Sequence, residues 1–157
     1  METFKLNLVA SLILKRGNEI LLYKRINTHY ENGNYGLIGG YIDGGETVYQ
    51  GIAREAKEEV GIDIKVEDLK VEHVMHSKAA GRYGEFITVF LSASDWQGEP
   101  KNMEPDRCGD LFWFLQNSLP DNTVKQIRSA LENINKGILL EKTKIVILSP
   151  YGGSPEG

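Results

Sequence analysis

The chain has 157 residues, of which 41% are hydrophobic and 25% are charged, and its formal net charge is −4. This length fits one domain with a sizeable core, and the composition is ordinary for a globular protein. The acidic balance provides no general basic field, which excludes strong attraction for nucleic acid polymers or anionic membranes. A phosphorylated ligand therefore has to be captured by metal ions and a few local cations.

Hydropathy and cysteine content narrow the class of protein to which the chain can belong. No apolar run approaches the roughly 20 residues that a membrane-spanning helix needs. The N-terminal segment carries Glu2 and alternates polar and apolar residues up to Val9, which is typical of a strand and not of a signal peptide. The single cysteine, Cys108, excludes an internal disulfide and fits a reducing cytoplasm. We interpret Cys108 as a passive thiol, because no base partner is evident.

The first quarter of the chain has strand and loop character. Residues 4–15 and 19–25 form strand-like runs, and the Arg16-Gly17-Asn18 sequence between them predicts a hairpin turn. Residues 27–40 are rich in Asn, Tyr and Gly, which is a loop composition.

A helix is predicted over residues 46–60, and Gly61 is well placed to end it. An apolar residue recurs at every fourth position of this segment, at Val48, Ile52, Ala56 and Val60. Gly51 interrupts the helix at a cost of about 1 kcal/mol relative to Ala. It either clears space for a phosphate or is tolerated without a function.

The same helix carries Glu55, Glu58 and Glu59 at spacings of three and four residues. Like charges at these spacings repel one another on an isolated helix. At about 100° per residue they project beside the apolar stripe, so we expect them at the rim of the core. Acids placed there, next to a glycine-rich turn, predict a site for divalent cations, and oxygen-only ligands suit Mg²⁺ or Mn²⁺.

The second half of the chain alternates further strands with a second helix. Pro120 and Asp121 are predicted to open that helix, in which apolar residues keep helical spacing. The chain shows no internal repeat and no linker, so the pattern predicts a single domain over 1–148 with a mixed α/β sandwich, followed by a disordered tail over 149–157. The strands are expected at 69–77, 83–92, 111–115 and 142–148, with a polar loop at 95–110.

One set of charged and glycine positions resembles the Nudix box. It comprises Gly40, Glu46 and the run Arg54-Glu55-Ala56-x-Glu58-Glu59-x-Gly61-Ile62. Ala56 is smaller than the residue often found there, and Ile38 replaces the usual proline before the box. The downstream segments Trp96-x-Gly98-Glu99-Pro100 and Trp113-Phe114-Leu115 are similar to the MutT-like branch, and the resemblance covers residues 4–136.

The resemblance implies a Nudix-type α/β/α sandwich, an α+β fold with a mixed sheet, in which the box helix carries the metal site. It implies Mg²⁺, or alternatively Mn²⁺, and water attacking a phosphorus of a diphosphate. For the MutT-like branch this means cleavage of nucleoside triphosphates, including oxidised purine nucleotides such as 8-oxo-dGTP, to monophosphate and pyrophosphate. The alternatives are cleavage of a sugar nucleotide or dinucleotide, and a non-catalytic nucleotide sensor. Residues 63–84 lack the proline that marks ADP-ribose enzymes, which disfavours that substrate.

The resemblance also assigns roles. Glu55 or Glu58 is implied as the base, and Arg54 is expected to pair with Glu46 and orient the loop against the helix. The implied metal ligands are the main-chain carbonyl of Gly40 and the carboxylates of Glu55, Glu58, Glu59 and Glu104.

Substrate contacts are expected from residues outside the box. Lys24 and Arg25, at the end of the second strand, are candidate phosphate clamps, with a solvated strand end as the alternative for Lys24. Asn122 stands where MutT-like enzymes read the purine edge, and Asp121 lies beside it; Asn122 is alternatively a helix-start residue. The expected partner is a small nucleotide and neither a nucleic acid polymer nor a membrane, and the sequence leaves a homodimer open.

Overall fold

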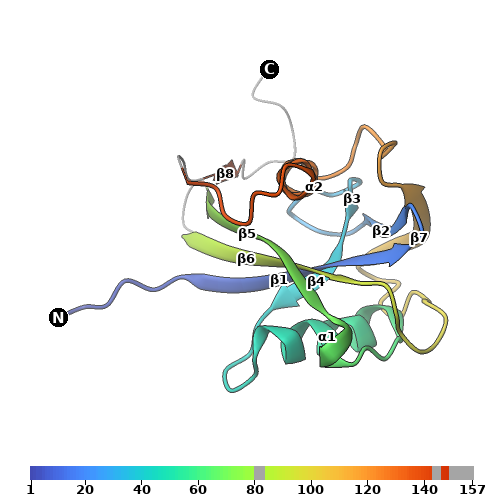
Figure 1. Ribbon diagram of the computed structural model, residues 1–157, viewed down its shortest axis with the longest axis horizontal. Helices are drawn as coiled ribbons and strands as arrows, with labels where there is room; N and C mark the ends of the chain where they lie inside the picture. The colour runs from blue at the N-terminus through green and yellow to red at the C-terminus, as the bar shows by residue number, and fades with distance from the viewer. Residues whose placement is uncertain (80–83, 143–145, 149–157) are drawn as a thin grey trace.

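The computed structural model describes residues 1–79, 84–142 and 146–148. The two described helices lie on opposite faces of a twisted sheet, which gives the molecule three layers (Figure 1). No described helix is long and apolar enough to cross a membrane. The predicted tail at 149–157 and the start of the predicted strand at residue 83 lie outside the described residues.

The sheet is mixed, as predicted. Its pairing order in the described chain is β3-β2-β1-β6-β5-β8, with β4 paired to β1 and β7 paired to β2. β1 is parallel to β6 and antiparallel to β2 and β4. The strands are β1 (Asn7–Arg16), β2 (Glu19–Arg25), β3 (Tyr35–Gly36), β4 (Ile38–Tyr41), β5 (Lys70–Ala79), β6 (Glu85–Ala93), β7 (Cys108–Leu115) and β8 (Val146–Leu148). The predicted α/β/α sandwich is therefore confirmed.

The β1–β2 hairpin forms where the sequence predicted it. β1 is a central strand, so its successive residues Leu12, Ile13 and Leu14 are all fully buried, on alternating faces. Gly17 lies in the turn with φ of 57°, a left-handed conformation that costs glycine little. One hydrophobic core lies on each face of the sheet, the first against α1 (Val48–Val60) and the second against α2 (Lys125–Asn135).

The helix α1 begins at Val48, whereas the sequence predicted a start at Glu46. Thr47 is its N-cap, since its side chain accepts from the Gln50 N–H at 3.2 Å and the Gln50 side chain accepts from the Thr47 N–H at 2.8 Å. This capping box stops the helix before Glu46 and leaves the Glu46 side chain to another partner. At the other end Gly61 has φ of 72° and closes the helix, as predicted.

The apolar stripe of α1 faces the sheet as predicted, with Ile52, Ala56 and Val60 buried at 1% exposure or less. Gly51 has a packing reason that neither interpretation of the sequence anticipated. A Cβ on Gly51 would lie 2.5 Å from Ile42 Cδ1 and 2.9 Å from Glu46 Oε1. The glycine therefore lets the loop before α1 pack against the helix.

The segment at 27–40 is not wholly a loop. It contains β3 and β4, and β4 pairs with β1 from Ile38 to Tyr41. These strands have two and four residues, too short for their alternation to be visible in the sequence. Their pairing depends on β1 and β2, which present the partner edges, so only the tertiary fold reveals them.

The later elements differ from prediction at their starts. β7 begins at Cys108, not at residue 111, because Cys108 pairs with Arg25 across a register shift in β2. The helix α2 begins at Lys125, since residues 120–124 form a turn in which the Thr123 N–H and hydroxyl both donate to the Pro120 carbonyl. Pro120 and Asp121 therefore precede the helix and do not open it.

Candidate active site

The three glutamates of α1 have different environments. The Glu59 side chain is buried at 9% residue exposure. The side chain of Glu55 is 14% exposed and that of Glu58 is 51% exposed. Glu59 and Glu55 therefore lie at the edge of the core, as predicted, whereas Glu58 reaches solvent.

The β4 backbone lies against these acids. The Gly39 N–H donates to Glu59 Oε2 at 2.9 Å. A Cβ on Gly40 would lie 2.4 Å from Glu55 Oε1, and one on Gly39 would lie 2.2 Å from the Ala10 carbonyl oxygen. Gly39 requires glycine because the backbone of β1 occupies the space of a Cβ, whereas a side chain at Gly40 would displace the Glu55 carboxylate. The glycine pair of the box thus brings main-chain groups next to Glu55 and Glu59.

Arg54 and Glu46 form the expected pair. Arg54 donates to both Glu46 oxygens, from Nε at 3.0 Å and from Nη2 at 2.7 Å. Glu46 also accepts from the Asp43 N–H at 2.7 Å, so the pair ties the loop before α1 to the helix. Arg54 and this N–H lower the pKa of the Glu46 carboxyl to about 2.

The same arginine contacts two of the acids. Arg54 Nη1 donates to Glu55 at 3.1 Å and to Glu58 at 3.2 Å. In the described part of the chain no Lys, Arg or His forms an ion pair with Glu59. Burial, against the opposing Gly39 hydrogen bond, raises the pKa of Glu59 to about 8, and the neighbouring Glu55 and Glu104 carboxylates contribute to this rise. Burial also raises the pKa of Glu55.

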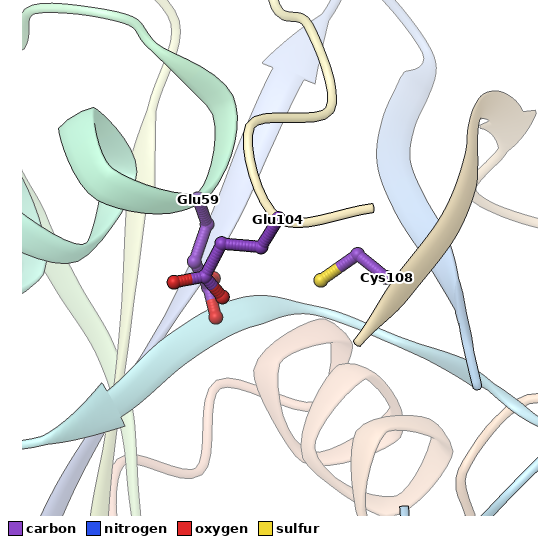
Figure 2. A group of neighbouring side chains, drawn as sticks. All are labelled: Glu59, Glu104 and Cys108. Carbon is purple, nitrogen blue, oxygen red and sulfur yellow. The ribbon is translucent and has the colours of Figure 1, made fainter. Parts of the chain in front are cut away.

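Glu104 reaches this site from the loop before β7, and Figure 2 shows its carboxylate beside that of Glu59. The Met103 N–H donates to the Glu59 carbonyl at 3.0 Å, which fastens the loop to the end of α1. Asn102 accepts from the Glu104 N–H at 3.0 Å and donates to the Cys108 and Gly109 carbonyls at 2.7 and 3.0 Å. The structure therefore places the predicted Glu104 with the box acids, and we refer to Glu55, Glu58, Glu59 and Glu104 as the acid group.

Cys108 lies beside two of these acids, a position that the sequence interpretation of a passive thiol did not anticipate. One ligand atom each from Glu59, Glu104 and Cys108 lie within 4.8 Å of one another. Cys108 is buried at 4% exposure, and burial raises the pKa of its thiol to about 12. Its position depends on a loop closed by backbone hydrogen bonds, which no periodicity predicts. The only signal in the sequence was its place four residues after Glu104.

Arg25 lies near the acid group, and Lys24 precedes it in β2. Arg25 pairs in register with Cys108, and its charge lowers the pKa of Glu59. Its Nε donates to the Tyr30 carbonyl at 3.1 Å and its Nη1 donates to the Tyr23 hydroxyl at 3.1 Å. Lys24 lies at the register shift between Tyr23 and Arg25, and its side chain is exposed.

Asn122 and Asp121 lie in the turn before α2, and both are exposed. Asn122 Nδ2 donates to the Gly33 carbonyl at 3.0 Å, and the Asn122 carbonyl accepts from the Tyr35 N–H at 2.9 Å. Within the described residues, no hydrogen bond or ion pair joins Asn122 or Asp121 to the acid group. The structure thus gives Asn122 a structural contact, and its base-reading role stays a prediction.

The chain is similar in sequence to proteins of one family. A profile of the NUDIX domain matches residues 5–134. An ADP-ribose pyrophosphatase from Methanocaldococcus jannaschii is 44% identical over 108 residues, which cover 69% of this chain and 61% of that protein. An NAD-capped RNA hydrolase NudC from Stutzerimonas stutzeri is 29% identical over 118 residues, covering 73% of this chain and 38% of that protein. The chain thus matches less than two thirds of the length of either relative.

Solved structures are similar in fold. A MutT NUDIX hydrolase from Burkholderia pseudomallei superposes with a TM-score of 0.75 at 31% identity, covering 82% of this chain and 98% of that chain. A MutT protein from Methanosarcina mazei gives a TM-score of 0.71 at 17% identity, covering 83% and 93%. The second similarity shows the fold alone.

Proposed function

The chain belongs to the NUDIX domain family, and from this premise we propose that it is a metal-dependent hydrolase of pyrophosphate linkages in nucleoside diphosphate derivatives. The observation that carries the proposal is the gathering of carboxylates beside the glycine turn, with Glu55 against Gly40 and Glu59 bonded to the Gly39 N–H. Glu104, from the loop before β7, lies beside Glu59 although like charges repel. Such an arrangement is favourable once a cation lies among the oxygens.

The donor set fits Mg²⁺ or Mn²⁺. Glu55, Glu59 and Glu104 offer carboxylate oxygens, and the Gly40 carbonyl is the predicted additional ligand. Hard divalent cations select oxygen ligands of this kind. When bound, Mg²⁺ neutralises charge on the phosphate oxygens and polarises a water molecule.

The protein residues have separate tasks in this proposal. Glu58 is the most exposed of the three helix acids, so it can meet a water molecule and accept its proton. Glu55 stays the alternative base. Arg54 holds both side chains through Nη1 and fixes their orientation. Arg25 offers a guanidinium for a substrate phosphate.

Two substrate classes compete. The 44% identity to an ADP-ribose pyrophosphatase favours a nucleoside diphosphate sugar. The 31% identity to a MutT NUDIX hydrolase, together with the missing proline over 63–84, supports nucleoside triphosphates. We place the nucleoside diphosphate sugar first and the triphosphate, including 8-oxo-dGTP, second.

A substrate panel tests both the proposed hydrolase activity and the choice between the two substrate classes. The full chain is incubated with ADP-ribose, NADH, diadenosine polyphosphates and nucleoside triphosphates including 8-oxo-dGTP, with Mg²⁺ or with a chelator. We expect Mg²⁺-dependent cleavage, with AMP and ribose 5-phosphate as products from ADP-ribose, or a monophosphate and pyrophosphate from a triphosphate. Reaction in ¹⁸O-labelled water identifies the attacked phosphorus by mass. No cleavage of any compound with Mg²⁺ or Mn²⁺ contradicts the hydrolase proposal.

A further inference from the structure

The thiol of Cys108 and two carboxylates face one small space. Figure 2 shows the Cys108 sulfur directed toward the side chains of Glu59 and Glu104. One ligand atom from each residue lies within 4.8 Å of the other two. The residues come from three segments, namely the end of α1, the loop before β7 and the first residue of β7. This cluster contains a sulfur donor, which a site for Mg²⁺ does not need.

Hydrogen bonds of the backbone fix the three residues relative to one another. The Cys108 N–H donates to the Glu104 carbonyl at 2.9 Å, and Asn102 binds main-chain groups of both residues. The Met103 N–H donates to the Glu59 carbonyl at 3.0 Å. A metal ion therefore meets donors that are already placed, which reduces the entropy lost on binding.

The carboxylates of the cluster also lack an ion-pair partner among the described residues. Cys108 and Glu59 are 4% and 9% exposed. Among the described residues no cationic side chain forms an ion pair with Glu59 or Glu104. Arg25 is the cation whose charge affects Glu59 and Cys108, but its guanidinium donates to the Tyr30 carbonyl and the Tyr23 hydroxyl. The carboxylate oxygens of Glu59 and Glu104 therefore lie beside the thiol with no ion-pair partner among the described residues, which favours a cation there.

Ligand chemistry selects the kind of cation. Sulfur with carboxylate oxygen suits Zn²⁺, which is bound by Cys, His and acidic side chains, and Mg²⁺ and Ca²⁺ prefer oxygen alone. We propose that Glu59, Glu104 and Cys108 form a binding site for a thiophilic divalent cation such as Zn²⁺. On binding, the metal–sulfur bond replaces the S–H bond, and the thiol proton passes to the buffer. The site shares Glu59 and Glu104 with the acid group, so Zn²⁺ competes with Mg²⁺.

Titration of the metal-free full chain with Cd²⁺ tests the site directly. Cd²⁺ bound to a thiolate absorbs in the ultraviolet, and Cys108 is the only cysteine of the sequence, so this absorption can come from no other residue. We expect the absorption to saturate at one Cd²⁺ per chain, and Zn²⁺ added afterwards to abolish it. Saturating Cd²⁺ without thiolate absorption overturns the proposal.

Variants separate this site from adventitious binding. Cys108→Ser should lose the absorption and weaken Zn²⁺ binding, measured by calorimetry, by more than about tenfold, since even groups that only support metal ligands contribute about 10- to 100-fold. Glu104→Gln should weaken Zn²⁺ binding similarly. The matched control is Glu99→Gln, which makes the same change at an exposed position of the same loop and should leave Zn²⁺ affinity unchanged.

A second variant and a further outcome test whether Cys108 is a metal ligand. If Cys108→Ser is unstable, Cys108→Ala serves as the second variant, and the Cd²⁺ absorption of the unmodified chain stands as a separate test. Zn²⁺ binding that is equally tight in the Cys108 variants shows adventitious binding and refutes the site. Because these measurements read metal binding without substrate, failure of the hydrolase proposal does not affect them.

Discussion

The acid group and the turn before α2 are both expected to meet the substrate, but they are built differently. In the first region the box residues contact one another over short separations, since Arg54 and Glu46 are 8 residues apart and Gly39 and Glu59 are 20 apart, and only Glu104 comes from a more distant segment. Charged side chains dominate it. In the second region Asn122 binds Gly33, which is 89 residues away, through one neutral hydrogen bond. A motif with local contacts can therefore specify its own geometry, whereas the turn depends on the complete fold.

Removal of the exposed acid should have the largest effect. Glu58→Gln keeps the shape of the side chain but cannot accept a proton, so we expect kcat to fall by about 100-fold or more. Because Glu58 lies at the surface of α1, thermal unfolding should stay close to that of the unmodified protein. Glu67→Gln, an exposed glutamate of the 3₁₀ helix Val66–Asp68, is the control and should turn over normally. Near-normal turnover in Glu58→Gln removes Glu58 from the mechanism and leaves Glu55 as the base.

Substitution of Gly40 tests whether the β4 backbone positions the Glu55 carboxylate. The Cβ of Gly40→Ala would lie 2.4 Å from Glu55 Oε1, so the carboxylate has to move. We expect Mg²⁺ affinity and turnover to fall by about 10- to 100-fold, as when a group that orients a metal ligand is lost. Gly44→Ala is a matched control, since its Cβ meets nothing within 4 Å. Equal activity of the two variants would show that the position of Glu55 is not critical.

The pH dependence of stability tests the environment of Glu59. Folded Glu59 keeps its proton up to about pH 8, whereas the unfolded chain releases it near 4.5. The unfolded state therefore binds fewer protons in this window, and the free energy of unfolding should fall as pH rises through it. Glu46 acts in the opposite sense, with a pKa lowered to about 2, so its contribution is complete above this window and is lost only in acid.

Thermal unfolding of the chelator-treated protein measures this effect. Glu59→Gln, which can still accept the Gly39 N–H, should flatten the decline between pH 5 and 8, an interval within the window set by the raised pKa. An identical pH profile in the two proteins means that Glu59 is ionised in the metal-free state.

The smallest effect is expected in the second region. Asn122→Ala removes one neutral hydrogen bond to Gly33 and should cost about 0.5–1.5 kcal/mol of stability. If Asn122 also reads the base, the ratio of kcat/KM between purine nucleotides should move toward one. A stability loss with unchanged base preference assigns Asn122 to the fold alone.

The sequence predicted the box region, where the residues that contact one another lie close together in the chain. The spacing of Glu55, Glu58 and Glu59 gave the helix face, and the resemblance supplied the Arg54–Glu46 pair that the structure contains. It did not predict β3 and β4, because two- and four-residue strands form only on the edges that other strands present. It also misplaced the start of α2, since the Pro120 turn looks like a helix start until Thr123 is seen to close it.

Cys108 shows the same limit inside the site itself. Nothing in its neighbours along the sequence indicates that its thiol approaches Glu59, which lies on another element. Loop closure by Asn102 and pairing with Arg25 bring it there. Long-range contacts of this kind decide which donors besides the box acids surround a metal, and the sequence pattern does not encode them.

Calorimetric titration of the metal-free full chain with Mn²⁺ tests the central claim most directly, because it asks whether the acid group binds a divalent cation without any assumption about substrate. We predict saturable binding that weakens by more than about tenfold in Glu59→Gln, which changes the buried carboxylate of the group. Binding to the Glu67→Gln control should match the unmodified chain. Equal Mn²⁺ affinity in Glu59→Gln and the unmodified protein would contradict the account.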